Sequence, residues 1–198
     1  MAPLNDEQLH QIRDERKEQI IEAALKVFSR RGIAGTKMSM IAAEAGISHG
    51  LLYHYFKSKD ELFITLVQRA MVGAHDAMKS IHGLQGSPLD KIKCLTKDIL
   101  DESGRPYFML IYQARTSEGV PEKAKELIAQ YSLKSFVDEL LPVFQEGQQT
   151  GDIAAGDPVE LISAYLSVLS SLMILNAQDE ENYRIPSGDI LMRMVTGP

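Results

Sequence analysis

Apolar residues recur along the chain at the three- and four-residue spacing of a helix, and no segment alternates in the manner of a strand. In residues 17–31, Ile21, Leu25 and Phe28 fall on one stripe, and Gly32 follows as a stop signal. This pattern predicts an amphipathic helix that ends at the glycine.

Two short helices joined by a tight turn are predicted next. Thr36 is the expected N-cap of the first helix, which runs to Ala45 and ends at Gly46. Ser48 is the expected N-cap of the second. The second helix is predicted to turn three apolar side chains inward, namely Leu51, Leu52 and Phe56.

A longer helix follows. Ser58 and Glu61 have the Ser-x-x-Glu spacing of a capping box, and the helical period continues to about Ile81. Proline with polar or acidic neighbours indicates further helix starts at Ser87–Pro88, Pro106, Pro121 and Asp157–Pro158, and Ser187 indicates another. The pattern therefore predicts an all-α fold of about nine helices.

Pro142 lies inside the helical pattern of residues 121–149. Proline has no backbone N–H and removes one hydrogen bond from a helix. We therefore expect a kink or a break of that helix at Pro142.

The charge is unevenly distributed along the chain, whose formal net charge is −6. Residues 1–70 hold 10 Lys and Arg against 9 Asp and Glu, a balance of +1, so residues 71–198 hold 11 against 18, a balance of −7. Local charge decides where a phosphate backbone can dock. Within residues 30–59 a single acid, Glu44, accompanies five basic residues, Arg30, Arg31, Lys37, Lys57 and Lys59.

Three features bear on the cellular location. The single cysteine, Cys94, cannot form an intramolecular disulfide, and the charged first residues lack the apolar core of a signal peptide. The most apolar stretch, Tyr165–Leu175, is interrupted by serines and is too short to span a bilayer. We expect a cytoplasmic protein without a membrane partner.

Residues 36–59 contain the most specific motif of the chain. The two short helices are separated by Gly46-Ile47-Ser48, a turn tight enough to cross them steeply. A solvated helix normally carries Lys and Glu on its outer face, whereas imidazoles and phenols suit base edges and phosphates. The outward residues of the second helix are His49, Gly50, Tyr53 and His54.

The segment from about Arg13 to Ala74 resembles the DNA-binding domain of the TetR family of regulators. The resemblance implies a symmetric dimer, an inducer pocket in the C-terminal part and repression relieved by ligand. It divides the chain into a helix-turn-helix domain (14–74, motif at about 37–56) and a ligand-sensing and dimerisation domain (75–198). The matching residues are Gly32, Thr36, Ile41-Ala42, Ala45-Gly46-Ile47-Ser48, Leu52-Tyr53-His54-Tyr55-Phe56 and Ser58-Lys59-Asp60-Glu61-Leu62.

By position, the resemblance implies a set of residues that face double-stranded operator DNA. His49 and His54 are not fixed by the family pattern, so they are the candidates for sequence discrimination. The charged segment from Asn5 to Arg16 is interpreted as a solvated helical extension, with a minor-groove arm as the alternative. The DNA-facing positions are Thr36, Lys37, Ser48, His49, Gly50, Tyr53, His54, Tyr55 and Lys59.

Bulky apolar residues with a few polar groups suggest a pocket for a small apolar or amphipathic inducer. Packing in the core is the alternative interpretation of the same apolar residues. His75 and His82 share a helix face but lack further ligands nearby, so neither a metal site nor a cofactor is predicted. The candidate pocket residues are Met71, His75, Met78, Phe108, Met109, Tyr112 and Phe136.

The segment 158–176 carries two adjacent apolar stripes, more than one neighbouring helix can cover. Together with the last helix it predicts a four-helix homodimer interface, and an ordinary buried central helix is the alternative. The predicted interface residues are Leu161, Ile162, Tyr165, Leu166, Val168, Leu169, Leu172, Met173, Ile190, Leu191 and Met194, with Val195 and Leu175 beside them.

These features predict a ligand-responsive transcription regulator, a repressor released from a palindromic operator by its inducer. An activator or a ligand-independent regulator of the same fold is the alternative. An enzyme would need a nucleophile–base or carboxylate pair in a pocket, which we do not find in the sequence. A protein-binding module without DNA affinity is disfavoured by Tyr53, Tyr55 and Lys59.

Overall fold

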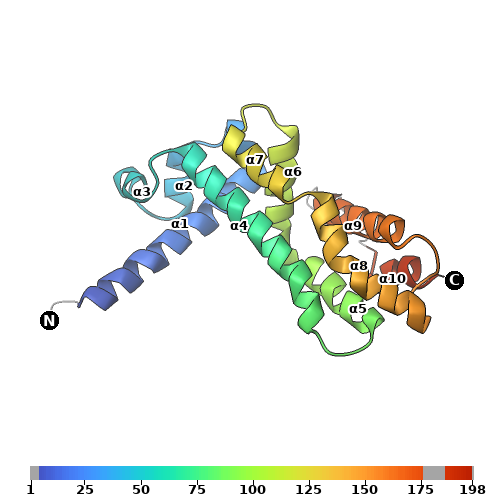
Figure 1. Cartoon of the computed structure of the whole chain (residues 1–198). Helices are drawn as coiled ribbons and strands as arrows, with labels where there is room; N and C mark the ends of the chain where they lie inside the picture. Colours follow the sequence, from blue (N-terminus) through green and yellow to red (C-terminus); the bar gives the residue numbers. More distant parts are fainter. Residues whose placement is uncertain (1–4, 176–185, 198) are drawn as a thin grey trace.

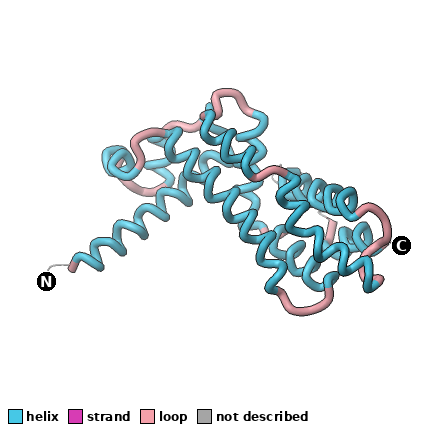
Figure 2. Tube along the Cα trace, viewed as in Figure 1, coloured by secondary structure: helices cyan, strands magenta, loops and turns pink. Residues whose placement is uncertain are grey.

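The computed structural model describes residues 5–175 and 186–197, and these contain ten α-helices, two 3₁₀ turns and no strand (Figures 1 and 2). The predicted all-α fold is confirmed. The helices are α1 (Asp6–Gly35), α2 (Met38–Glu44), α3 (His49–Tyr55), α4 (Lys59–Ser80), α5 (Pro88–Ile99), α6 (Arg105–Thr116), α7 (Glu122–Gln130), α8 (Leu133–Thr150), α9 (Pro158–Leu175) and α10 (Gly188–Thr196), and the 3₁₀ turns are η1 (Ile81–Gly83) and η2 (Glu102–Gly104).

Helix α1 begins well before its buried part. Asn5 and Gln8 form a reciprocal capping box, so the charged segment that follows is helical, and its first turns project from the body in Figure 1. Leu9 and Ile12 are exposed there. The expected stop is present, because Gly32 has a φ of 65° and interrupts the helix.

The expected cap at Thr36 is wrong. Lys37 occupies the N-cap position of α2 and makes no side-chain capping bond. Thr36 instead donates its hydroxyl hydrogen bond backward, to the carbonyl of Gly32 at 2.6 Å. The broken turn at the end of α1 leaves that carbonyl without its helical partner. This explains why the Thr36 hydroxyl bonds to the Gly32 carbonyl and does not cap α2.

The helical pattern 121–149 forms two helices, and of the kink or break expected at Pro142 the break is wrong. The helix is interrupted at Tyr131–Ser132, where the Ser132 hydroxyl accepts a hydrogen bond from the amide of Ser135 and caps α8. Helix α8 continues through Pro142. A long helix tolerates the loss of one hydrogen bond when its buried face is held by packing.

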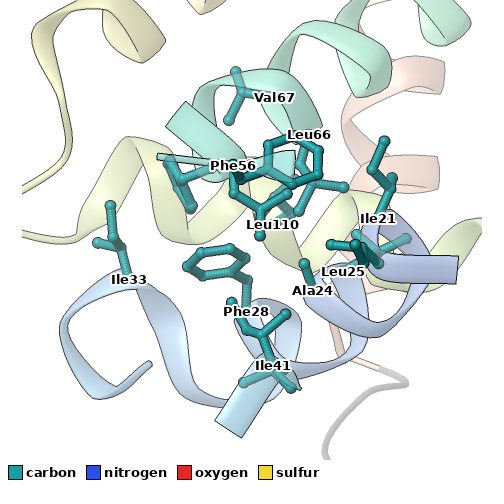
Figure 3. Close-up of a cluster of buried hydrophobic side chains, with 14 of the residues drawn as sticks. Ile21, Ala24, Leu25, Phe28, Ile33, Ile41, Phe56, Leu66, Val67 and Leu110 are labelled. Carbon is teal, nitrogen blue, oxygen red and sulfur yellow. The ribbon is translucent and has the colours of Figure 1, made fainter. Parts of the chain in front are cut away.

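Two clusters of buried apolar side chains form the core. The first joins α1–α4 with α6 and α7: Phe28 packs edge-to-face on Phe63 with ring centroids 5.1 Å apart. Leu110 of α6 lies among these residues in Figure 3, and α7 adds Ala124 and Ile128. The core therefore crosses the boundary predicted at residue 74, which stays a prediction.

The second cluster joins the end of α4 with α5, α8, α9 and α10. Its largest buried side chains include Phe144 of α8 and Tyr165 of α9, with Ile81 and Ile92 beside them. This cluster forms the end of the molecule opposite to α3 (Figure 1).

Two polar contacts fix α1 against the later helices. Arg69 of α4 makes a bidentate ion pair with Glu18, at 2.6 Å for both bonds, and hydrogen bonding to this guanidinium lowers the pKa of Glu18. The amide of Gln113 on α6 donates to the carbonyl of Ser29 at 2.9 Å. Helix α6 is thus attached to α1 close to its break at Gly32.

Candidate nucleic-acid interface

The α2–α3 segment forms a helix-turn-helix. Gly46 has a φ of 64°, which allows the sharp turn, and the Ser48 hydroxyl accepts from the amide of Leu51 at 3.2 Å to start α3. Leu52 is fully buried, and Phe56 follows it into the core. These two anchors fix which face of α3 points outward.

The outward face of α3 carries the residues that the sequence placed there. His49, Gly50, Tyr53 and His54 are exposed. The His49 and Tyr53 rings pack edge-to-face with centroids 4.9 Å apart, so the tyrosine is held in place by its neighbour one turn away. Tyr55 is half-buried against the core.

The prediction that Leu51 turns inward is wrong. It is exposed on α3, whereas Leu52 and Phe56 supply the buried contacts. A leucine is usually assigned to the core, and a seven-residue helix has room for only one buried row, so the pattern alone misplaced this residue.

The flanks of the motif differ from the prediction at Thr36. Thr36 is 2% exposed, and its hydroxyl is used by Gly32, so its side chain is not available to a duplex. Lys37 is exposed. The Lys59 ammonium group donates to the carbonyl of Ile33 at 2.7 Å and is half-buried, which places a cation between the end of α1 and the start of α4.

Lys57 was not assigned a contact from the sequence. Its ammonium group donates to the carbonyls of Tyr53 and His54 at 3.3 and 3.5 Å, at the end of α3. A lysine at a helix C-terminus interacts favourably with the free carbonyls there. Its place within the basic stretch 30–59 was the available signal.

The candidate pocket residues lie in different environments. Met71 and Met78 are buried in the first and second cluster, respectively, so packing accounts for both. Tyr112 is exposed on α6. The remaining candidates are half-buried: His75, Phe108, Met109 and Phe136.

His75 has the most unusual surroundings of these candidates. Its ring lies 5.5 Å from that of Tyr131 and 6.5 Å from that of Phe136, centroid to centroid. Its Nδ1 atom is buried and has no hydrogen-bond partner in the described part of the chain. Tyr131 was missed by the sequence reasoning because it lies at the break between α7 and α8.

An open pocket of about 430 Å³ lies elsewhere, between the end of α6 and the α7–α8 junction. None of the seven predicted pocket residues lines it. Among residues 5–175 and 186–197, no three His, Cys, Asp or Glu side chains are placed to hold a metal ion. His82 instead contacts one carboxylate, with its Nε2 atom 3.4 Å from Oε2 of Glu139. The pocket is lined by Ala114, Arg115, Ser117, Lys125, Ile128, Ala129, Ser132 and Leu133.

Most of the predicted dimer residues are buried within the protomer, which corrects their assignment to an outward interface. The hydroxyl of Tyr165, for example, lies 2.8 Å from that of Thr96, and burial raises the pKa of Tyr165 to about 12. Helices α6, α8 and α10 cover this side of α9. The buried residues are Ile162, Tyr165, Leu166, Leu169, Leu172, Met173 and Leu191.

The opposite side of α9 remains open to solvent in the protomer. Leu161, Val168 and Met194 are half-buried, and Ile190 of α10 is 58% exposed. The expectation that the apolar stretch is too short to span a bilayer is wrong, because α9 is long and apolar enough to cross a membrane; the core helix of a soluble protein passes the same test. The exposed face of α9 consists of Val159, Glu160, Ala164, Ser167, Ser171 and Leu175.

Gly50 provides a test of whether α3 meets a duplex closely. A methyl group at this position would meet no atom within 4 Å, so the protomer does not require glycine there. We expect Gly50→Ala to raise the free energy of unfolding by about 0.5–1 kcal/mol, because glycine is unfavourable inside a helix. Affinity for duplex DNA, measured by fluorescence anisotropy, is expected to fall about 10-fold because the added methyl group obstructs close approach.

Gly73 of α4 supplies the matched control, because a methyl group there also meets no atom within 4 Å. Gly73→Ala should give the same gain in stability and leave DNA affinity unchanged. Equal DNA affinity of Gly50→Ala and wild-type protein would show that no duplex approaches the backbone at Gly50.

Comparison with known proteins agrees with this geometry. A sequence profile described as "Bacterial regulatory proteins, tetR family" matches residues 20–66. The HTH-type transcriptional regulator RutR of Escherichia coli is 30% identical over 148 residues, which cover 74% of this chain and 68% of RutR. The HTH-type transcriptional repressor NicS of Pseudomonas putida is 26% identical over 166 residues, 83% of this chain and 77% of NicS.

Solved structures share the fold over nearly the whole chain. FadR from Bacillus subtilis in complex with stearoyl-CoA superposes with a TM-score of 0.65 at 21% identity, covering 91% of this chain and 98% of FadR. At this level of identity the likeness shows the fold alone.

Proposed function

Because the chain belongs to the TetR family of bacterial regulatory proteins and is a ligand-responsive DNA-binding transcription regulator, we propose that it acts as a homodimeric repressor. A small apolar or amphipathic inducer would release it from a palindromic operator. The observation that carries the proposal is the outward face of α3, formed by His49, Gly50, Tyr53 and His54.

Helix α3 would enter the major groove, where its imidazoles read base edges. The Tyr53 hydroxyl, held in place by the His49 ring, would donate to a phosphate. Lys37 and Lys59 lie before and after the motif and would contact phosphates on either flank. Ser48 is exposed at the turn and completes this surface.

A dimer formed through the exposed face of α9 would present two copies of α3. Binding to successive turns of B-DNA requires these helices to lie about 34–36 Å apart. Small side chains such as Ala164, Ser167 and Ser171 allow two copies of α9 to approach closely. Ile190 of α10 would extend the apolar contact.

Ligand binding would act through α4, which carries His75 and packs against both α1 and α6. The half-buried His75, Tyr131 and Phe136 offer apolar walls and one free polar atom, which suits an amphipathic molecule. A neighbour of known structure, FadR, was solved with stearoyl-CoA, which also has an apolar chain and a polar head. Movement of α6 would shift α1 through the Gln113–Ser29 bond and change the spacing of the two α3 helices. A coupling of about 1–3 kcal/mol would weaken DNA binding 5- to 150-fold.

We place the protein in the cytoplasm, where its operator is found. The apolar character of α9 is explained by its buried side and the proposed dimer contact.

Tyr53→Phe and Lys59→Ala test the DNA interface. Both are expected to weaken binding to the promoter of the protein's own or adjacent gene about 100-fold, because each removes one hydrogen bond to a charged phosphate in each of the two half-sites. Lys59→Ala should also lower the slope of log affinity against log salt by about 2, one contact for each protomer, and Tyr53→Phe should not. Fluorescence anisotropy at several salt concentrations measures both effects.

Lys79→Ala is the matched control, because this exposed lysine lies on the same helix as Lys59 but at its other end. All three variants should remain dimers by light scattering. Failure of the wild-type dimer to bind promoter DNA at submicromolar concentration in low salt would overturn the proposed function.

A further inference from the structure

Leu51 is an apolar side chain on a surface otherwise suited to polar contacts. It is 38% exposed, as much as Tyr53 at 39%. Leu52, the next residue, is fully buried and anchors α3 in the core. The fold of the protomer therefore leaves much of the Leu51 side chain open to solvent.

The neighbours of Leu51 leave space around it. Gly50 has no side chain, and a methyl group built there meets nothing within 4 Å. The opposite flank of α3 is occupied by the His49 and Tyr53 rings, which pack edge-to-face. Leu51 and His54 are three residues apart and so lie on the same side of the helix.

Helix α3 itself carries no Lys or Arg side chain that would attract a phosphate. Between Ser48 and Phe56 the chain contains no Lys, Arg, Asp or Glu. The exposed lysines Lys37 and Lys57 lie outside this interval, before and after α3. Lysine contacts to phosphates therefore belong to the flanks, whereas the centre of the face can meet base edges.

We propose that Leu51 determines specificity by packing against the C5-methyl group of a thymine in the major groove. The inference rests on the proposed entry of α3 into that groove. Among the groups that unmodified B-DNA presents there, the thymine methyl is the apolar one, and the remainder are hydrogen-bond donors and acceptors. Placing a leucine against a donor or acceptor would desolvate that group without a partner, so Leu51 favours thymine and disfavours the other bases.

Deoxyuridine tests this contact because it differs from thymidine only by the methyl group. A duplex is first selected from a random library with the full-length wild-type protein. Each symmetry-related pair of thymines is then replaced by deoxyuridine in turn, and the affinities of wild-type protein and Leu51→Ala are measured by anisotropy. Burial of one methyl group corresponds to about 4-fold in affinity, and therefore to about 15-fold over two half-sites.

At one thymine pair, deoxyuridine is expected to weaken the wild-type protein about 15-fold and Leu51→Ala less than 2-fold. Leu133→Ala, which alters an exposed leucine at the start of α8, should retain the wild-type penalty. A penalty that persists in Leu51→Ala, or no penalty at any thymine, would overturn the proposal. Selection that enriches no duplex would instead contradict the proposed DNA-binding function.

Discussion

Glutamate in place of Ala164 is expected to convert the dimer into monomers and to lower operator affinity about 100-fold or more. Ala164 lies on the exposed face of α9, so a glutamate there is solvated in the separate protomer. In the proposed dimer, two symmetry-related carboxylates would be desolvated close together without a partner. The cost of burying unpaired charge is at least about 3 kcal/mol, which corresponds to a 100-fold rise in the dimer dissociation constant.

Light scattering or analytical ultracentrifugation at micromolar protein measures the change in mass, and anisotropy measures DNA binding. Glutamate favours helix formation, so the helix content of the folded protomer, measured by circular dichroism, should be unchanged. Ala129→Glu is the matched control, because Ala129 is also an exposed helical alanine, on α7. A variant that remains dimeric would show that the exposed face of α9 is not the interface.

Alanine in place of Phe28 should lower the free energy of unfolding by about 3–5 kcal/mol. Phe28 is fully buried, and its ring packs edge-to-face on Phe63 in the first core cluster. Truncation removes this aromatic contact and leaves a cavity between α1, α4 and α6. Single domains have a total stability of about 5–15 kcal/mol, so the loss is a large part of it.

Urea denaturation followed by circular dichroism gives this quantity. Phe108→Ala is the comparison, because it makes the same chemical change at a half-buried position on α6 and should cost less. Phe28→Leu, which keeps most of the volume, should also cost less. A loss below about 1 kcal/mol for Phe28→Ala would mean that the site collapses around the smaller residue and that the ring is not an anchor of the core.

Local signals in the sequence predicted the helix starts well. The Ser58 and Glu61 spacing and the Ser87 and Asp90 pair both mark helix starts in the structure, because a cap depends on residues within one turn of each other. Most of the outward face of α3 was also predictable, since Leu52 and Phe56 fix its orientation, but Leu51 was wrongly turned inward. Thr36 was misplaced because its hydroxyl has two backbone options, and only the broken turn at Gly32 decides between them.

The orientation of α9 could not be predicted from its sequence. The sequence of α9 has two adjacent apolar stripes. From these alone one cannot tell which side of the helix packs inside the protomer and which side contacts a partner. That choice depends on where α6, α8 and α10 pack, which is a long-range property. Pro142 is a similar case, because packing of α8 outweighs the local cost of the proline.

The first core cluster has a consequence for building hybrid regulators. Because α6 and α7 supply Leu110, Ala124 and Ile128 to the core that holds the helix-turn-helix, a chimera joined at residue 74 would pair these residues with foreign partners. A transplant of the DNA-binding part into a relative with a different inducer would therefore need the apolar faces of α6 and α7 to be transferred as well. Exchanging only the exposed residues of α3 leaves that core intact, and so offers a more direct route to a new operator.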